Sequence, residues 1–210
     1  MKYLYIDTSS NYLYTGIVSN NKLLIEVKER LDHNLSKDSV PLISKMFEKT
    51  NIQPKDINKI IVVDGPGSFT GIRIGITIAK VYAHSMNIPI TTISSLEAMA
   101  LSTNKENYLV PVIDARRDYV YTAIYDNEMN EILKPTHIEL NKLQEELEKI
   151  EKYTIISNDN IDRFGTPERY DPNIEKIVLK YKDKENMNPH EVNPNYLKLT
   201  EAEEKLRNND

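Results

Sequence analysis

The feature that most constrains the fold of this chain is an internal repeat. Residues 6–18 read IDTSSNYLYTGIV, residues 113–125 read IDARRDYVYTAIY, and the two segments align without a gap. Six of the thirteen aligned positions are identical. Each copy is rich in residues that favour strands and contains an aspartate followed by polar residues typical of a turn. The pattern predicts that a unit of strand, aspartate, tight turn and returning strand occurs twice.

The repeat has two interpretations. Two hairpins rich in strand-forming residues resemble each other by chance, or each of two lobes opens with the same unit. In the second case Asp7 and Asp114 end their strands and point into a cleft, because ligands of α/β sheets bind beyond the carboxyl ends of strands. Two such lobes around a cleft are the layout of ATP-binding proteins related to actin and Hsp70. We therefore expect a two-lobed actin/Hsp70/sugar-kinase-like (ribonuclease H-like) α/β fold, each lobe a mixed sheet with helices.

The polar segment 102–107 is the candidate boundary between these lobes. We expect a first lobe over residues 1–102 and a smaller second lobe over residues 103–194, with a C-terminal helix within 195–210 packing back on the first lobe. Apolar residues recur at helical spacing over 36–50, 71–86 and 141–151. The apolar run 60–63 predicts a strand that is buried on both faces. Weaker patterns predict strands at 153–156 and 177–179.

Four of the six glycines of the chain lie within residues 65–75, which read GPGSFTGIRIG. A glycine loop before a helix can cradle a phosphate at the helix N-terminus. Neither of the two established phosphate-binding motifs is present. A P-loop needs Gly-Lys-Ser/Thr where this chain has Gly71-Ile72-Arg73, and the third glycine of a dinucleotide-binding motif comes one residue too late. The segment therefore favours a tight strand-to-helix connection over a phosphate site.

The helix that follows has small residues every four positions. Two glycines inside a helix cost about 1 kcal/mol each relative to alanine, and close approach of another element offsets that cost. The small residues Gly71, Gly75, Ala79 and Ala83 form a ridge along one side of this helix. Either the ridge packs internally, against the sheet or helix 36–50, or it is an exposed surface that a second protein contacts. Because so short a chain has little material to cover that helix, both interpretations stay open, and a partner would contact Gly71, Ile72, Gly75, Ile76, Ala79 and Ala83.

Composition excludes several classes of function. The chain has no cysteine, which excludes disulfides, Cys-ligated zinc and a thiol nucleophile. Its net charge of −5 argues against free-standing RNA binding. The start of the chain lacks the pattern of a signal peptide, and no apolar run approaches the ~20 residues that span a bilayer. We expect a cytoplasmic protein without a membrane partner.

The predicted turns at the cleft carry no glycine. They read Ser9-Ser10-Asn11 and Arg116-Arg117-Asp118, and side chains at these positions impede close approach of the backbone to a phosphate. Asp7 and Asp114 either hold Mg²⁺ through water or, as we favour, cap their turns. Arg116 and Arg117 either contact phosphate or RNA or are solvated. The candidate residues on the phosphate side of the cleft are Asp7, Ser9, Asp114, Arg116 and Arg117.

Five motifs carry a resemblance to a known family. They are Asp7-Thr8-Ser9, the glycine run 65–75, SSLEA at 94–98, IDARR at 113–117 and PNYLK at 194–198. In this order and spacing the chain resembles the TsaB (YeaZ) family of bacterial tRNA-modification subunits, over nearly its whole length. The resemblance implies the actin/Hsp70-like fold and a complex with the catalytic paralogue TsaD and the ATPase TsaE. That complex transfers a threonylcarbamoyl group onto the adenosine beside the anticodon of ANN-decoding tRNAs.

The resemblance also implies which surfaces meet and which chemistry is missing. In the family, the helices corresponding to 36–50 and 71–86 contact TsaD or a second copy of the subunit, so the resemblance adds Ile43, Met46 and Phe47 to the expected interface. The catalytic paralogues carry a His-x-x-x-His metal pair where this chain has Leu96-Glu97-Ala98-Met99, and none of its four histidines forms such a pair. We therefore expect a non-catalytic subunit without a metal site or cofactor of its own. ATP or Mg²⁺ would bind at a shared interface, and tRNA only through the complex.

Two enzymatic alternatives come from the same residues. An ATP-dependent small-molecule kinase of the same fold would use Asp7 or Asp114, although the glycine-free turns argue against tight nucleotide binding. A peptidase is disfavoured because the chain has no cysteine, no clustered histidines and no Gly-x-Ser-x-Gly elbow.

Overall fold

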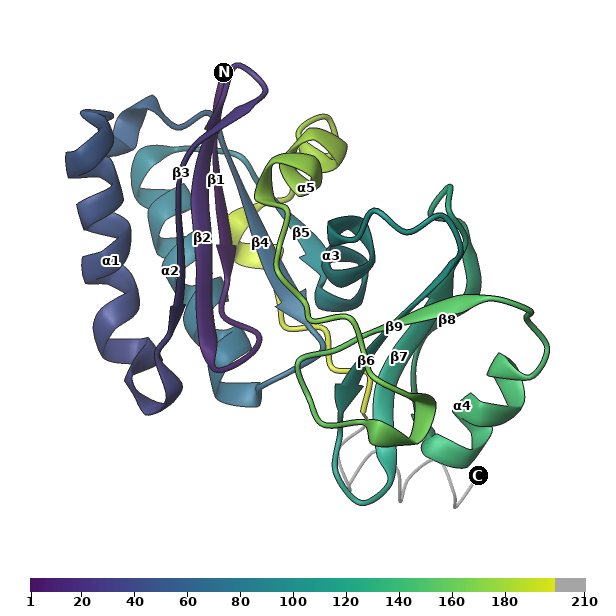
Figure 1. Ribbon diagram of the computed structural model, residues 1–210. Helices are drawn as coiled ribbons and strands as arrows, with labels where there is room; N and C mark the ends of the chain where they lie inside the picture. The colour runs from purple at the N-terminus through teal and green to yellow at the C-terminus, as the bar shows by residue number, and fades with distance from the viewer. Residues whose placement is uncertain (199–210) are drawn as a thin grey trace.

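The computed structural model describes residues 1–198, the side chain of Asp162 excepted, and shows two lobes joined through a short helix (Figure 1). The sheet of the first lobe has the strand order β3-β2-β1-β4-β5. β1 pairs antiparallel with β2 and parallel with β4, and β4 pairs parallel with β5. The strands are β1 (Lys2–Asp7), β2 (Tyr12–Ser19), β3 (Lys22–Arg30), β4 (Lys59–Gly65) and β5 (Ile90–Ser94).

Helices cover both faces of this sheet. Figure 1 shows α1 and α2 on one side, and α3 and α5 on the other. Strand residues alternate between the two faces: Leu4 and Ile6 pack in the cluster of α1 and α2, whereas Tyr3 and Tyr5 pack in that of α3 and α5. The helices are α1 (Leu35–Thr50), α2 (Phe69–Met86), α3 (Ser95–Ser102) and α5 (Ile174–Tyr181), and single 3-10 turns lie at Asp32–Asn34, Pro54–Asp56, Asp162–Phe164 and Pro189–Glu191.

The apolar run of β4 explains why this strand is central. Ile60 and Val62 belong to the α1/α2 cluster, and Ile61 and Val63 belong to the α3/α5 cluster. All four side chains are at most 1% exposed. Each contributes about 1.5–3 kcal/mol by leaving water, so the strand stabilises both layers at once. The predicted burial on both faces is confirmed.

The second lobe repeats the topology of the first. Its sheet has the order β8-β7-β6-β9, which corresponds to β3-β2-β1-β4. The two copies of the sequence repeat form β1–β2 and β6–β7, each an antiparallel pair at the start of its lobe. The predicted fold class is therefore confirmed. The elements are β6 (Tyr108–Asp114), β7 (Tyr119–Tyr125), β8 (Glu131–Glu139), α4 (Leu140–Leu147) and β9 (Tyr153–Ile156).

Helix α3 joins the two lobes because it is apolar on nearly all sides. Ala98 and Leu101 pack in the core of the first lobe, whereas Leu96, Met99 and Ala100 pack against the sheet of the second lobe. Such a helix must be buried on both sides. It therefore fixes the second lobe beside the carboxyl ends of β1 and β4.

Three predicted features differ from the structure. Residues 177–179 belong to helix α5 and not to a strand, and α5 packs on the first-lobe sheet. The chain thus returns to the first lobe before residue 195, because Ile174, Ile177 and Val178 complete its core. Strand β8 was missing from the predicted elements. Of the predicted C-terminal helix 195–210, residues 195–198 are not helical, and the remainder lies outside the described residues.

Asp64 provides a test of this packing through pH. It is the penultimate residue of β4, and its Oδ1 atom is buried without a hydrogen-bond partner. Burial raises the pKa of Asp64 to about 6. The nearby Glu97 carboxylate adds to this increase, whereas a hydrogen bond with Thr92 opposes it. The folded pKa lies above the unfolded value of 3.8, so the carboxylate destabilises the fold above about pH 6, and this penalty disappears as the pH falls toward 4.

Replacement Asp64→Asn is therefore expected to raise the free energy of unfolding at pH 8 by about 1–2 kcal/mol, after discounting for partial exposure, and to leave it nearly unchanged at pH 4. Urea unfolding at both pH values measures this difference. The exposed control Glu106→Gln should show no comparable gain. Equal stability of Asp64→Asn and the unmodified chain at pH 8 would contradict the buried position of Asp64.

Candidate functional site

Two regions of the structure are candidates for function. One is the outer surface of α1 and α2, where the sequence places a partner interface. The other is the cleft between the lobes, where the fold class places ligands.

The ridge of small residues on α2 faces its own sheet. A Cβ atom added to Gly71 would lie 2.1 Å from the carbonyl oxygen of Thr8, and one added to Gly75 would lie 2.4 Å from the Thr8 hydroxyl oxygen. The Thr8 hydroxyl donates a hydrogen bond of 2.7 Å to the Gly71 carbonyl. The glycines thus allow the end of β1 to approach the helix closely.

The other residues predicted for the interface are also directed inward. They are all buried in the cluster between the sheet and the two helices, and comprise Ile72, Ile76, Ala79, Ala83, Ile43, Met46 and Phe47. The expectation that these residues and the two glycines form an exposed seam is wrong. The physical reason is that close approach of the sheet, and not of a second protein, offsets the cost of the glycines.

The same helices also expose apolar side chains. Val40 of α1 is 55% exposed, and Val81 and Met86 of α2 are 61% and 43% exposed. Phe69, at the first position of α2, is 56% exposed. Half of the eight large exposed hydrophobic residues among residues 1–198 lie on these two helices. We call the exposed surface of α1 and α2 that carries Val40 and Val81 the outer face; α1 and α2 lie together on the side of the first lobe away from the second (Figure 1).

A cleft of about 1250 Å³ lies between the lobes. Its walls come from the turn after β1, the loop before α2, the end of β6 and the segment around residue 170. Among its lining residues are Ser9, Ser10, Tyr12, Lys28, Arg30, Ser68, Asp114, Arg116, Asp159, Arg169 and Asp171.

Asp7 does not reach the open part of this cleft. Its side chain is 1% exposed. One carboxylate oxygen accepts a hydrogen bond of 2.8 Å from the Ser9 amide, and the other lies 3.4 Å from the hydroxyls of Tyr5 and Tyr170. Burial raises the pKa of Asp7, and the hydrogen bonds from Ser9 oppose that increase. Asp7 therefore caps its turn, as the sequence favoured, and its oxygens are engaged within the lobe.

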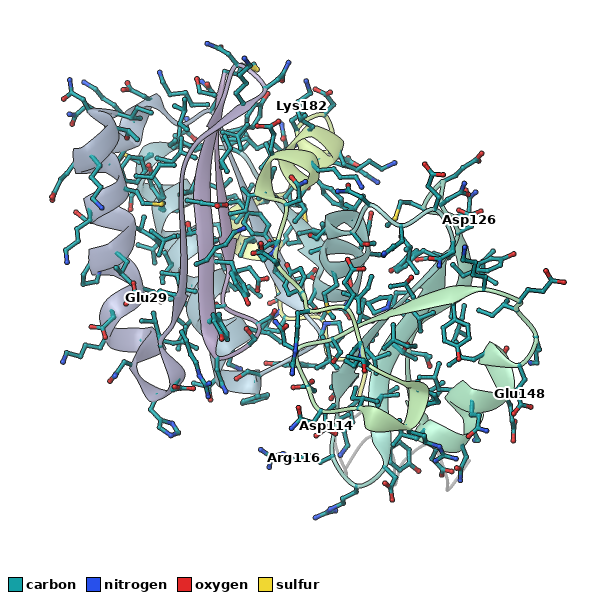
Figure 2. All side chains as sticks on the ribbon, viewed as in Figure 1. Glu29, Asp114, Arg116, Asp126, Glu148 and Lys182 are labelled. Carbon is teal, nitrogen blue, oxygen red and sulfur yellow. The ribbon has the colours of Figure 1, made fainter. Side chains whose placement is uncertain are left out.

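Asp114 makes the same cap in the second lobe but is exposed. Its Oδ1 accepts a hydrogen bond of 2.7 Å from the Arg116 amide. Arg116, Arg117 and Asp118 have positive φ angles of 67°, 55° and 62°, a left-handed backbone that residues 8–11 of the turn after β1 do not adopt. Figure 2 shows Asp114 and Arg116 together at the end of the β6–β7 hairpin. Ser9, Asp114 and Arg116 thus meet at the cleft, whereas Arg117 does not line it.

The cations of the cleft that the sequence did not single out already have local partners. Lys28 forms an ion pair of 2.7 Å with Asp171, and Arg30 forms one of 3.0 Å with Asp32. Arg169 donates a hydrogen bond of 2.6 Å to the Asn158 carbonyl. Lys28 and Arg30 alternate along β3, which was the available sequence signal, while no local pattern marked Arg169.

The cleft residues fit a magnesium-bound nucleotide poorly. Among residues 1–198, no group of three or more His, Asp or Glu side chains is arranged to hold a metal. The Asp7 carboxylate is sealed by the Tyr5 and Tyr170 hydroxyls. At the second turn the Asp159 carboxylate accepts a hydrogen bond of 2.8 Å from the Asp114 amide. Asp114 and Asp159 therefore both bind backbone amides of this region. We therefore derive no reaction step in this cleft.

Comparison with known proteins decides the family. A family model described as "TsaD: tRNA N6-adenosine threonylcarbamoyltransferase" matches residues 26–176. The tRNA threonylcarbamoyladenosine biosynthesis protein TsaB of Bacillus subtilis is 30% identical over 223 residues, covering 98% of this chain and 97% of that protein. The chain belongs to the TsaB (YeaZ) family. The resemblance found in the sequence is therefore confirmed.

Further TsaB relatives and solved structures agree with this assignment. TsaB of Escherichia coli is 35% identical over 96 residues, which cover 44% of this chain and 42% of that protein. The structure of YeaZ from Pseudomonas aeruginosa matches with a TM-score of 0.73 at 18% identity and covers 93% of this chain and 100% of the other. This likeness shows the TsaB fold. As a separate finding, no helix formed by residues 1–198 has both the length and the apolar character needed to cross a membrane.

Proposed function

We propose that this TsaB homologue is a non-catalytic partner subunit required for threonylcarbamoylation of the adenosine next to the anticodon in ANN-decoding tRNAs. It acts by binding and stabilising the catalytic paralogue TsaD, together with the ATPase TsaE. The relatives support the pathway, since they are described as tRNA threonylcarbamoyladenosine biosynthesis proteins. The observation that carries the role is the outer face, where two adjacent helices with packed inner sides expose Val40 and Val81.

The cost of leaving these side chains in water supports a docking surface. A buried apolar side chain gains about 25 cal/mol per Å² removed from solvent. Scattered exposed hydrophobic residues are ordinary, but half of the large ones among residues 1–198 belong to the two adjacent helices α1 and α2. A pair of helices from a related fold, packed against α1 and α2, would cover that side.

The cleft supports an accessory role. Its two aspartate turns are held by their own carboxylates, and its main cations are already paired. We propose that ATP or Mg²⁺ acts at an interface shared within the complex and that tRNA binds only through the complex. Without TsaD, the same helices would serve a homodimer. The location that this function requires is the cytoplasm.

Reconstitution tests this function. Purified chain, TsaD, TsaE, tRNA and threonylcarbamoyl-adenylate are mixed, with each omitted in turn, and modified adenosine is measured by mass spectrometry. We expect that omission of the chain reduces product at least tenfold, and that the chain with ATP and Mg²⁺ alone gives no turnover. Full product without the chain would refute the proposal. ATP turnover by the isolated chain would favour the kinase alternative, which no observation of the described residues supports.

A further inference from the structure

A groove runs along the flank of α2, beside the segment that follows α5. We call residues 189–196 the strap. Helix α2 and the strap enclose a groove of about 650 Å³. Its lining consists of Arg73, Ile76, Thr77, Lys80, Val81, Val192, Asn193, Pro194 and Tyr196. The groove is separate from the cleft between the lobes and shares Val81 with the outer face.

The middle of the groove is apolar. Ile76 and Val192, which are 4% and 0% exposed, belong to the first-lobe core and form its base. Val81 and Tyr196 stand at its sides and are 61% and 41% exposed. A ligand lying here would therefore remove exposed apolar surface from water without rearranging the core.

Arg73 is held in place at one end of the groove. Its guanidinium carbon lies 3.8 Å from the centroid of the Phe69 ring, and its Nε donates a hydrogen bond of 2.7 Å to the Tyr196 hydroxyl. Phe69 and Tyr196 are themselves stacked, with ring centroids 5.3 Å apart. These contacts orient the guanidinium before any partner arrives, and its remaining N–H groups suit a carboxylate. Aromatic residues next to arginine are the composition that dominates binding energy at interfaces.

Lys80 supplies a second positive charge two helical turns further along α2. Its ammonium group donates hydrogen bonds to the carbonyls of Val192 at 2.9 Å and His190 at 3.2 Å. These acceptors are neutral, and the ion pairs found among residues 1–198 include neither Lys80 nor Arg73. The groove lining contains no carboxylate. This chain carries a net charge of −5, so an uncompensated pair of cations marks the groove as distinct from the average surface.

We propose that this groove binds an acidic amphipathic helix of the partner protein. The inference rests on the proposed function and extends the docking surface from the outer face to the strap. Lys80 follows Arg73 by seven positions on α2, which corresponds to a rise of about 10 Å. Two carboxylates spaced two turns apart on the incoming helix would therefore meet both cations. Apolar side chains between those carboxylates would cover Ile76 and Val81, which is recognition of a helix in a groove.

Charge reversal tests the groove. Arg73→Glu and Lys80→Glu are made separately in the full chain, and the Kd for purified TsaD is measured at low and at physiological salt. Each reversal is expected to raise the Kd at least tenfold and to weaken its dependence on salt. The matched control Lys142→Glu, on exposed α4 of the second lobe, is expected to leave the Kd unchanged. Lys80→Arg keeps the charge and should retain binding, which separates the charge from the packing of the strap.

The outcomes separate this inference from the proposed function. If Val40→Asp on α1 abolishes binding to TsaD but both charge reversals leave it unchanged, the outer face is the interface and the groove proposal fails. If the reversals weaken only self-association, the occupant is a second copy of this chain and the proposal also fails. If a charge reversal lowers the thermal unfolding midpoint, its Kd is no longer informative, and Lys80→Gln is compared with Lys80→Arg instead. Equal affinity of these two variants for TsaD overturns the proposal.

Discussion

Replacement Gly71→Ala is expected to destabilise the chain by about 3 kcal/mol, although alanine favours helices. At an exposed helix position the same change would stabilise by about 1 kcal/mol. Here the new Cβ atom would lie 2.1 Å from the Thr8 carbonyl oxygen, a backbone atom of a turn fixed by the Asp7 cap. Helix α2 or the end of β1 must therefore move, and the hydrogen bond from Thr8 to the Gly71 carbonyl is strained or lost.

Gly75→Ala provides a graded comparison in the same ridge. Its Cβ would meet the Thr8 hydroxyl at 2.4 Å, and a side chain yields more readily than backbone, so we expect a loss of about 2 kcal/mol. The control Thr77→Ala, exposed on the same helix, should be neutral or slightly stabilising. Urea unfolding followed by circular dichroism measures all three. A stable Gly71→Ala chain that had only lost its partner would restore the ridge as an exposed interface.

Val81→Asp is expected to weaken binding to TsaD about a hundredfold, or roughly 2.7 kcal/mol. Val81 is the most exposed large apolar residue of the outer face at 61%, and a carboxylate there would have to be desolvated when the partner docks. Its stability should change by less than about 0.5 kcal/mol, because the side chain packs little in the free chain. Val40→Asp, 55% exposed on α1, should act in the same direction.

The control for both variants is Ile132→Asp. Ile132 is 53% exposed on β8 of the second lobe, so the chemical change is similar and only the location differs. Titration of each variant into TsaD, with its unfolding midpoint measured in parallel, gives the comparison. Retained affinity of Val81→Asp and Val40→Asp, with loss in Ile132→Asp, would place the interface on the second lobe instead.

The overall architecture was predictable because two of its causes are local in sequence. The repeat at residues 6–18 and 113–125 specifies the hairpin that opens each lobe, and the four-residue apolar run 60–63, followed closely by a glycine loop, favours a strand buried on both faces. Strand β8 was not predictable in the same way. It is an edge strand with Pro135 in its middle, and neither its alternation nor its boundaries are distinct.

The direction of the α2 ridge could not be read from the sequence. Small residues every four positions show that something approaches the helix closely, but a strand end and a partner helix require the same spacing. Helix α5 shows the same ambiguity at shorter range, because an apolar run such as 177–179 suits either a strand or a buried helix. The aromatic and cationic contacts among Phe69, Arg73 and Tyr196 join segments 123 residues apart, and no local pattern announces them.

Methyl NMR of the isotopically labelled chain during titration with unlabelled TsaD tests the central claim most directly. The methyl groups of Val40 and Val81 are exposed on the outer face, whereas those of Ile43 and Ile76 point into the core from the same helices and Ile132 reports on the second lobe. We predict that the Val40 and Val81 signals shift or broaden first and that the Ile132 signal does not change. Shifts at Ile132 or at Ile113 in the cleft, with Val40 and Val81 unaffected, would contradict the account.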